Sequence, residues 1–416
     1  MEADDGTVNE VLLNSGLINW IGIVGGIRFA QRTRFKKNFQ STIYWFYEIF
    51  TDLTVFINIL SQIFALMASE KMTERCLIGF PLVSCSFCFF ISNYPRFKRQ
   101  EFATLVLRYD DVFPNTQYSD HLEEEIKKAA ERVRLTSTIL VFLELGPMFT
   151  FCLILPLVNE ASGFALGPRK VAIPSLWPWD PLASFKNYII LVFIHAWASI
   201  FVNLKKIGFE ESFFIFASRQ VALLRHLRYN LEKLFDPLEV NVDGTVNKNE
   251  FTSPQRYWME EKLTQWVKDH QHCLRLFYEL EALYKWPICI YFGATILILC
   301  TSTFVTSDNS IDSQTCIICG VFTTGIFCEL FFICRMGDHI QIETEELLLG
   351  LSGKNAFLSN WKEFKYLRMI MTRCQKESVI RAAGGFPLTI STFKSITTSS
   401  YSYYTLLKEV NGKLTE

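Results

Sequence analysis

Residues 386–410 read FPLTISTFKSITTSSYSYYTLLKEV, and this C-terminal stretch decides how the whole chain is interpreted. At 1.5 Å per residue, a helix of this length can cross a lipid bilayer. The stretch nevertheless contains Lys394 and ten serines or threonines between Thr389 and Thr405. A lysine near the middle of a lipid-facing helix costs about 2.5–3.5 kcal/mol on the insertion scale. We therefore expect a membrane helix that faces protein or water rather than lipid.

A helical projection divides this stretch into two faces. The first face carries small hydroxyls, one leucine and one carboxylate, namely Ser391, Ser395, Ser399, Ser402, Leu406 and Glu409. The opposite face is largely apolar, with Ile390, Phe393, Ile396, Tyr404 and Leu407. The first face suits a pore wall, with Leu406 as a dewetting constriction and Glu409 as a charged mouth. It suits equally a helix buried in a bundle whose hydroxyls bond neighbouring helices.

The composition of the chain places it among integral membrane proteins. Half of its 416 residues are hydrophobic, and 38 of them are phenylalanine. The net charge of −1 gives no reason to expect a nucleic-acid partner. The sequence contains no P-loop, GxGxxG or HExxH motif, and its six histidines lack metal-ligand spacing. We therefore expect no enzyme activity, no cofactor and no metal site, and we interpret the twelve cysteines as small apolar residues.

Seven apolar stretches are long enough to span a bilayer. They lie at about 44–68, 76–94, 135–158, 185–204, 287–305, 314–336 and 386–410, with the third broken by Gly146 and Pro147. A shorter apolar stretch at 17–27 is predicted to be re-entrant or interfacial.

The distribution of basic residues predicts the orientation of these spans. The N-terminal segment and alternate connections hold 33 lysines and arginines, whereas the remaining connections and the C-terminus hold six. Because cytoplasmic segments attract Lys and Arg, we expect a cytoplasmic N-terminus and an extracellular C-terminus. This is the reverse of a G-protein-coupled receptor, and the D/E-R-Y and NPxxY motifs of that class are missing. A transporter would show internal repeats, which we do not find.

The connections between the spans carry further helices. Residues 205–286 contain two sets of apolar residues at helical spacing, around a polar loop at 236–255. The sets are Phe213, Phe216, Val221, Leu224, Leu227, Leu231 and Leu234, and Leu263, Trp266, His270, Leu274, Phe277 and Leu280. We expect both sets to be packed, because such faces are too large to leave in water. A shorter amphipathic helix is predicted from Phe357 to Met371.

The predicted organisation is therefore that of an all-α membrane protein whose cytoplasmic helical extensions form a packed unit. Its segments are a cytoplasmic region 1–43, spans one to four at 44–204, the helical extensions at 205–286, spans five and six at 287–336, the amphipathic helix region 337–385, and the pore-like helix with its tail at 386–416.

This organisation resembles the insect odorant receptor family. The resemblance lies in the inside N-terminus, the stretch GLINWIGIVGG at 16–26 and, most specifically, the tail SYSYYTLL at 400–407. Gustatory receptors of the same superfamily have a related but different tail and remain the nearest alternative. The resemblance implies an odorant-gated, non-selective cation channel in the plasma membrane of a sensory dendrite. This chain would be a tuning subunit that assembles with a shared co-receptor in a heterotetramer surrounded by lipid.

The resemblance also implies roles for individual residues. The last span would line the pore through Ser395, Ser399 and Ser402, with the gate at Leu406 and a polar position at Glu409. A small volatile ligand would bind among the outer halves of the spans. The candidates there are Phe80, Ser84, Phe87, Met148, Phe149, Cys152, Tyr188, Val192, His195, Leu297 and Thr301. For each, ordinary core packing remains an alternative.

Five polar residues within the spans need an explanation. Tyr188 and His195 could donate hydrogen bonds to an ester, aldehyde or alcohol oxygen. The carboxyl group of Glu144 is expensive inside a membrane, so it either has a function or pairs with a nearby base. Glu48 and Asp52 are expected to serve packing low in the first span.

Overall fold

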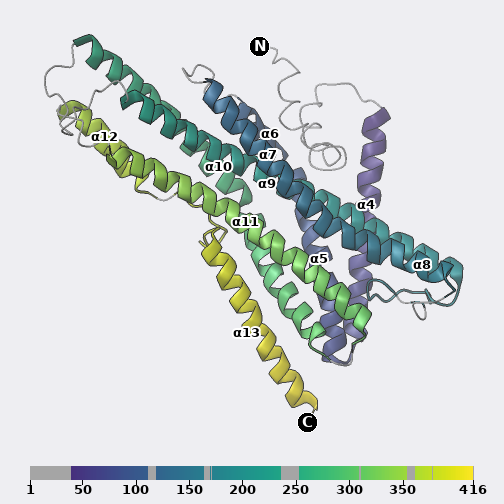
Figure 1. Cartoon of the computed structure of the whole chain (residues 1–416). Helices are drawn as coiled ribbons and strands as arrows, with labels where there is room; N and C mark the ends of the chain where they lie inside the picture. The colour runs from purple at the N-terminus through teal and green to yellow at the C-terminus, as the bar shows by residue number, and fades with distance from the viewer. Residues whose placement is uncertain are drawn as a thin grey trace.

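The computed structural model describes residues 39–110, 119–163, 169, 171–235, 253–308, 311–353, 361–376 and 378–415. The predicted re-entrant stretch 17–27 lies outside these residues, as do residues 236–252 of the predicted polar loop 236–255. The last three residues of that predicted loop are helical and begin α10. The described residues are almost entirely helical (Figure 1). Their elements are α4 (Phe39–Ala68), α5 (Met72–Phe97), α6 (Arg99–Asp110), α7 (Ser119–Phe149), the π-helix η1 (Thr150–Ile154), α8 (Leu155–Ala161), α9 (Phe185–Phe235), α10 (Ser253–Thr306), α11 (Ser313–Gly353), α12 (Trp361–Cys374) and α13 (Ile390–Thr415).

Six helices in the described part of the chain are long and apolar enough to cross a membrane. They correspond to the first six predicted spans. The seventh, α13, has the length of a span at 26 residues but is more polar than the other six, as its lysine and hydroxyl content predicts.

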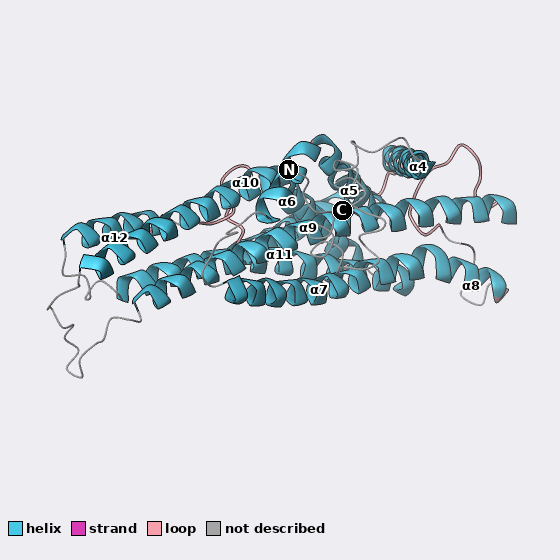
Figure 2. Ribbon diagram, turned by 90° about the horizontal axis from the view of Figure 1, so that it is seen from above, coloured by secondary structure: helices cyan, strands magenta, loops and turns pink. Residues whose placement is uncertain are grey.

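Three helices continue far beyond the thickness of a bilayer. Helix α10 has 54 residues, which corresponds to about 80 Å, whereas the hydrocarbon core is about 30 Å thick. Helix α9 has 51 residues and α11 has 41. Their extensions gather at one end of the molecule with α6, α12 and the start of α7 (Figure 1). Figure 2 shows α4 end-on, whereas α7 and α11 run lengthwise.

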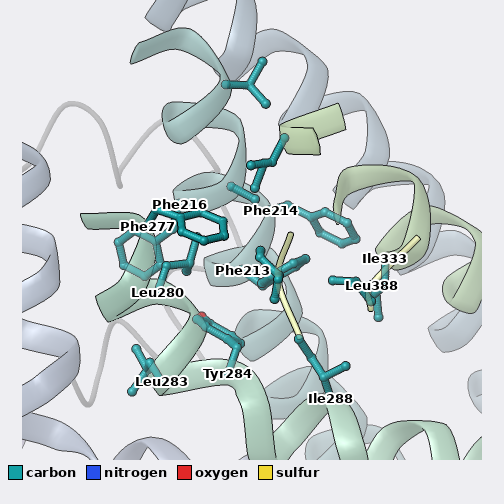
Figure 3. Packing of buried hydrophobic residues seen from close by; sticks show 14 of the residues in the cluster. Phe213, Phe214, Phe216, Phe277, Leu280, Leu283, Tyr284, Ile288, Ile333 and Leu388 are labelled. Carbon is teal, nitrogen blue, oxygen red and sulfur yellow. The ribbon is translucent and has the colours of Figure 1, made fainter. Parts of the chain in front are cut away.

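The extensions pack through the apolar residues that the sequence predicted, all of which are buried. Phe213, Phe214 and Phe216 of α9 meet Phe277 and Tyr284 of α10 (Figure 3). The hydroxyls of Ser212 and Tyr284 lie 2.6 Å apart and satisfy each other within this core. The expectation that these two helical faces are packed is confirmed.

Ion pairs connect the spans near the level at which the extensions begin. Arg96 of α5 pairs with Glu48 and with Asp52 of α4, and Lys205 of α9 lies 3.3 Å from Asp52. Glu48 and Asp52 therefore hold α4 against α5 and α9, in agreement with a packing role.

Two predicted features of the helices are wrong. Gly146 and Pro147 do not break the third span, because the helix continues through Pro147 and widens into η1. Residues 386–389 are not the first turn of the last helix. Gly384 and Gly385 have φ of +95° and +87°, and they form a turn in which Leu388 N–H donates to Ile380. Because Pro387 follows this turn and pairs with Arg381 in an isolated bridge, the helix begins only at Ile390.

Candidate ligand cavity and gate helix

An apolar cavity of about 200 Å³ lies among α5, η1, α8, α9 and α11. It is found at the end of the spans opposite to the helical extensions. This end contains Leu155 and Asn159 of α8, Tyr188 in the first turn of α9, and Thr315 in the first turn of α11. With few polar atoms among many apolar ones, the cavity has the character of a small-molecule site.

Five of the candidate ligand residues line this cavity, and they come from four elements: Phe80 and Ser84 from α5, Met148 from α7, Cys152 from η1 and Tyr188 from α9. Helical spacing explains the pair on α5, because residues four apart lie on one face.

The other candidates lie elsewhere. Val192 is buried in the bundle. Phe87 lies deeper and lines the smaller cavity described below, with its ring centroid 5.5 Å from that of Tyr291. Phe149 is 41% exposed and Leu297 is 53% exposed on the outer surface. Thr301 donates its hydroxyl hydrogen bond to Leu297 of its own helix. Sequence alone could not separate these residues from the lining ones, because it does not say which helices are neighbours.

His195 also lies outside the cavity, and it contacts the segment that closes it. The ring is 1% exposed, and its Nε2 lies 3.3 Å from the hydroxyl of Ser175. Trp177 donates its indole N–H to the same hydroxyl at 2.9 Å. The preceding residues 171–174 form part of the cavity wall. His195 therefore positions the covering segment 171–184, while Tyr188 lies beneath the guanidinium of Arg169.

The sequence analysis missed this covering segment and the whole contribution of α11. The covering segment contributes Val171, Ala172, Ile173 and Pro174 to the cavity wall, and α11 contributes Ile318, Cys319, Phe322 and Ile326. The sequence did contain a signal for the covering segment, because VAIPSLWPW at 171–179 is too apolar for a solvated connection. Helix α11 gave no comparable signal, since its whole span is apolar.

A smaller cavity of about 40 Å³ adjoins the inner end of the first, and charged residues line it. Lys206 Nζ lies 2.8 Å from Glu144, 2.7 Å from Glu329 and 3.2 Å from Glu210. All four side chains are buried. One oxygen of each carboxylate lies within 4.8 Å of the others, which is a spacing that a metal ion could use. The ammonium of Lys206 already fills the position between them, so Lys206 is their counter-ion. Glu144 has the basic partner that the sequence analysis considered.

Helix α13 has the two faces that its sequence predicts. On the apolar face, Phe393 packs its ring edge-on against Phe327 and Phe331 of α11, and Ile396 is buried. On the opposite face Ser395, Ser402 and Glu409 are exposed, Ser399 is half-buried, and Leu406 is 55% exposed. Further along the apolar face, Tyr404 and Leu407 pack against a buried cluster that includes Phe304 and Val305 of α10.

The segment before α13 is fixed to α11 by a close backbone approach. A Cβ atom on Gly337 of α11 would collide with the backbone carbonyl and the side chain of Leu388. Leu388 is fully buried and belongs to the same core as Ile333 (Figure 3). Glycine at position 337 is therefore a packing requirement. Helix α11 contacts the apolar cavity, the charged residues and the base of α13.

Comparisons with known proteins agree with this architecture. The model of the 7tm Odorant receptor family matches residues 71–401. Odorant receptor 2a of Drosophila melanogaster is 23% identical over 244 residues, which cover 58% of this chain and 59% of that protein. The odorant receptor coreceptor of Ooceraea biroi is 20% identical over 169 residues, covering 40% of this chain and 35% of that protein. The matched part thus spans less than two thirds of either relative.

A solved structure extends the similarity of fold to nearly the whole chain. The olfactory receptor OR5 of Machilis hrabei, in complex with eugenol, superposes with a TM-score of 0.73. The superposition covers 97% of each chain at 17% identity. At this identity the likeness concerns the fold alone.

Proposed function

The chain belongs to the insect odorant receptor family, and from this premise we propose that it is an odorant-gated cation channel subunit whose ligand binds in the apolar cavity. The observation that carries the proposal is the cavity of about 200 Å³, with its apolar walls and its covering segment 171–184. Volatile odorants are small and mostly apolar, and a dry cavity with few polar groups suits them. The matched family model is that of odorant receptors, so the gustatory alternative is not favoured.

The proposed route from ligand to gate runs through α11. A ligand contacts Ile318 and Phe322 on one part of this helix, while Phe327 and Phe331 contact α13 further along. A ligand that binds better when α11 has shifted stabilises the shifted state by its difference in affinity. Phe393 then moves with α11, and the exposed face of α13 rotates or withdraws. In this proposal Leu406 is the hydrophobic gate, and Ser395, Ser399 and Ser402 line the pore.

The outer mouth of the pore is proposed to carry Glu409. This carboxylate lies 2.7 Å from Lys413 of the next helical turn, and both side chains are exposed. Lys413 therefore offsets part of its negative charge. We expect Glu409 to concentrate cations less strongly than an isolated carboxylate would.

The proposed assembly is a heterotetramer with the shared co-receptor in the plasma membrane of a sensory dendrite. The helical extensions gather at one end of the molecule (Figure 1), and their sequence is rich in lysine and arginine. By the positive-inside rule, we propose that this end and the N-terminus are cytoplasmic and that the C-terminus is extracellular. Tyr401, Tyr403 and Leu406 of α13 are exposed in the single chain, and a neighbouring subunit would cover them.

A matched pair of substitutions in α5 tests the ligand site. Ser84 lines the cavity, whereas Ser86 lies two residues away on the exposed face. Ser84→Phe fills the cavity, so we expect the half-maximal odorant concentration to rise at least about tenfold. Ser86→Phe should leave it within about twofold. The measurement is whole-cell current against odorant concentration in cells that also express a co-receptor, with surface labelling of both variants. Equal sensitivity of the two variants, at equal surface expression, would contradict the cavity as the ligand site.

A further inference from the structure

Resting on the proposed function, we propose that the site selects ligands whose polar end donates hydrogen bonds, such as an alcohol or a primary amine, over ligands that only accept them. The donor would enter the 40 Å³ cavity and bind the carboxylates of Glu144 and Glu329, while the carbon skeleton fills the apolar cavity. Three features of the two cavities support this inference: their shared walls, the unused acceptors in the inner one and the charges around it.

The two cavities are continuous in their walls. The same residues of α5, α7, α9 and α11 line both of them: Ser84, Cys88, Met148, Asn203, Phe322 and Ile326. A molecule in the larger cavity can therefore extend one end into the smaller. The volume of about 40 Å³ exceeds the roughly 10–15 Å³ that one water requires, so a hydroxyl or ammonium group fits.

The inner cavity contains hydrogen-bonding atoms that the protein leaves unused. Within the described part of the chain, Glu144 Oε1, Glu329 Oε1 and the hydroxyl of Tyr291 have no hydrogen-bond partner. All three residues line this cavity, and Tyr291 is 5% exposed. Buried polar atoms in native proteins nearly always have a partner. Two of these three atoms are carboxylate oxygens, which accept hydrogen bonds from a donor.

The charged groups around the inner cavity also favour a ligand that donates hydrogen bonds. Lys206 is shared by three buried carboxylates, so the acidic groups outnumber the basic one. Hydrogen bonds to charged acceptors are stronger than neutral ones. The carbonyl oxygen of an aldehyde, ketone or ester would meet these acceptors with an unfavourable interaction. Asn203, which lines both cavities, already donates to Ser199 and accepts from Cys88.

The hydrogen-bonding role of the protein at this site is therefore the reverse of the expected one: the protein accepts, and the ligand donates. The sequence analysis assigned donors to the protein, in Tyr188 and His195, for a ligand that accepts. His195 lies outside the cavity beside Ser175, and Tyr188 lies at the outer rim below Arg169. The inner end instead presents acceptors, so the ligand is the donor.

The experiment compares ligands that share one carbon skeleton. The probes are octanol, octyl methyl ether and octylamine, and benzyl alcohol, benzyl methyl ether and benzylamine, applied to cells that express the chain with a co-receptor. In the unaltered protein we expect the alcohol or the amine to reach half-maximal current at a concentration at least about tenfold below that of the matched ether. The alcohol and amine arms distinguish a neutral donor from a cationic one.

Two variants connect this preference to the inner cavity. Tyr291→Phe removes the unused hydroxyl, and Glu144→Gln removes one negative charge. Both should lower the donor preference, measured as the half-maximal concentration of the ether divided by that of the matched alcohol or amine, and Glu144→Gln should affect the amine more than the alcohol. Tyr109→Phe is the control, because Tyr109 is a buried tyrosine that bonds Gln220 and lines neither cavity. The response to ether within the same cells shows that each variant folds and opens.

The outcomes separate this inference from the proposed function. If ethers match alcohols and amines in the unaltered protein while Ser84→Phe still weakens every response, the donor preference is wrong and the ligand site stands. If the preference exists but neither variant changes it, the inner cavity is not its source. A chain that reaches the surface with its co-receptor and responds to no probe fails the proposed function itself.

Discussion

At the scale of single residues, Gly337 offers the clearest prediction. A methyl group there would collide with the backbone of Leu388, whereas a methyl group on Gly320 of the same helix would meet nothing within 4 Å. Alanine favours a helix over glycine by about 1 kcal/mol at either position, so only the collision separates the two substitutions. Overpacking costs about 1–3 kcal/mol. We expect Gly337→Ala to lower the melting temperature of the purified complex and Gly320→Ala to preserve or raise it.

The same two alanine variants test whether the contact between Gly337 and Leu388 affects the gate. Because Leu388 precedes α13 by two residues, displacement at Gly337 should also change the basal current. Equal melting temperatures and equal basal currents for the two alanine variants would show that Leu388 tolerates displacement from α11.

The chemical character of single residues could be foreseen from sequence more readily than their positions. Glu144 was expected to need a function or a base, and it has Lys206. His195 was expected to need a polar partner, and it has Ser175 of the covering segment rather than a ligand. Desolvation makes a buried polar group require a partner, but it does not say which one. Helix contacts decide that, and they are not encoded in a local pattern.

At the scale of elements, Lys206 connects α9 to α7 through Glu144 and to α11 through Glu329. Lys206→Met leaves three buried carboxylates without their cation, and breaking a buried pair in this way costs about 3–5 kcal/mol. We expect the variant to lose most of its surface expression. Adding Glu329→Gln should restore part of it, because one uncompensated carboxylate is removed. Lys268→Met in an exposed position of α10 is the control. Unaltered expression of Lys206→Met would mean that the carboxylates need no counter-ion.

Element boundaries were predictable where periodicity continued and unpredictable where proline intervened. The apolar spacing from Phe213 to Leu234 correctly predicted that α9 extends past the bilayer. Pro147 was interpreted as a break, yet α7 continues through it to Phe149, and η1, which follows, places Cys152 in the cavity wall. Pro387 was included in a helix, although the two preceding glycines form a turn. Proline restricts the local backbone, while tertiary packing selects among the remaining conformations.

At the scale of the whole molecule, the seven-helix architecture followed from hydropathy, and the division of α13 into two faces followed from its helical period. The face with Phe393 and Ile396 packs within the chain, as the projection predicted. The opposite face is exposed in the single chain, so its surroundings are set by the assembly of subunits. The two alternatives that the sequence left open are therefore a question of assembly.

Cysteine substitutions along α13 decide whether its exposed face lines a pore or packs against protein. Ser395→Cys, Ser399→Cys and Ser402→Cys lie on the pore-like face, whereas Ser400→Cys lies on the packed face, where Ser400 is 5% exposed. If α13 lines a pore, a membrane-impermeant thiosulfonate should modify the first three, faster when odorant opens the channel, and should spare position 400. The unsubstituted protein, treated in the same way, measures the background from native cysteines such as Cys316, which is half-buried near the start of α11. Modification at position 400 with silence at the other three would place the hydroxyl face against protein, and the pore would have to be sought on another helix.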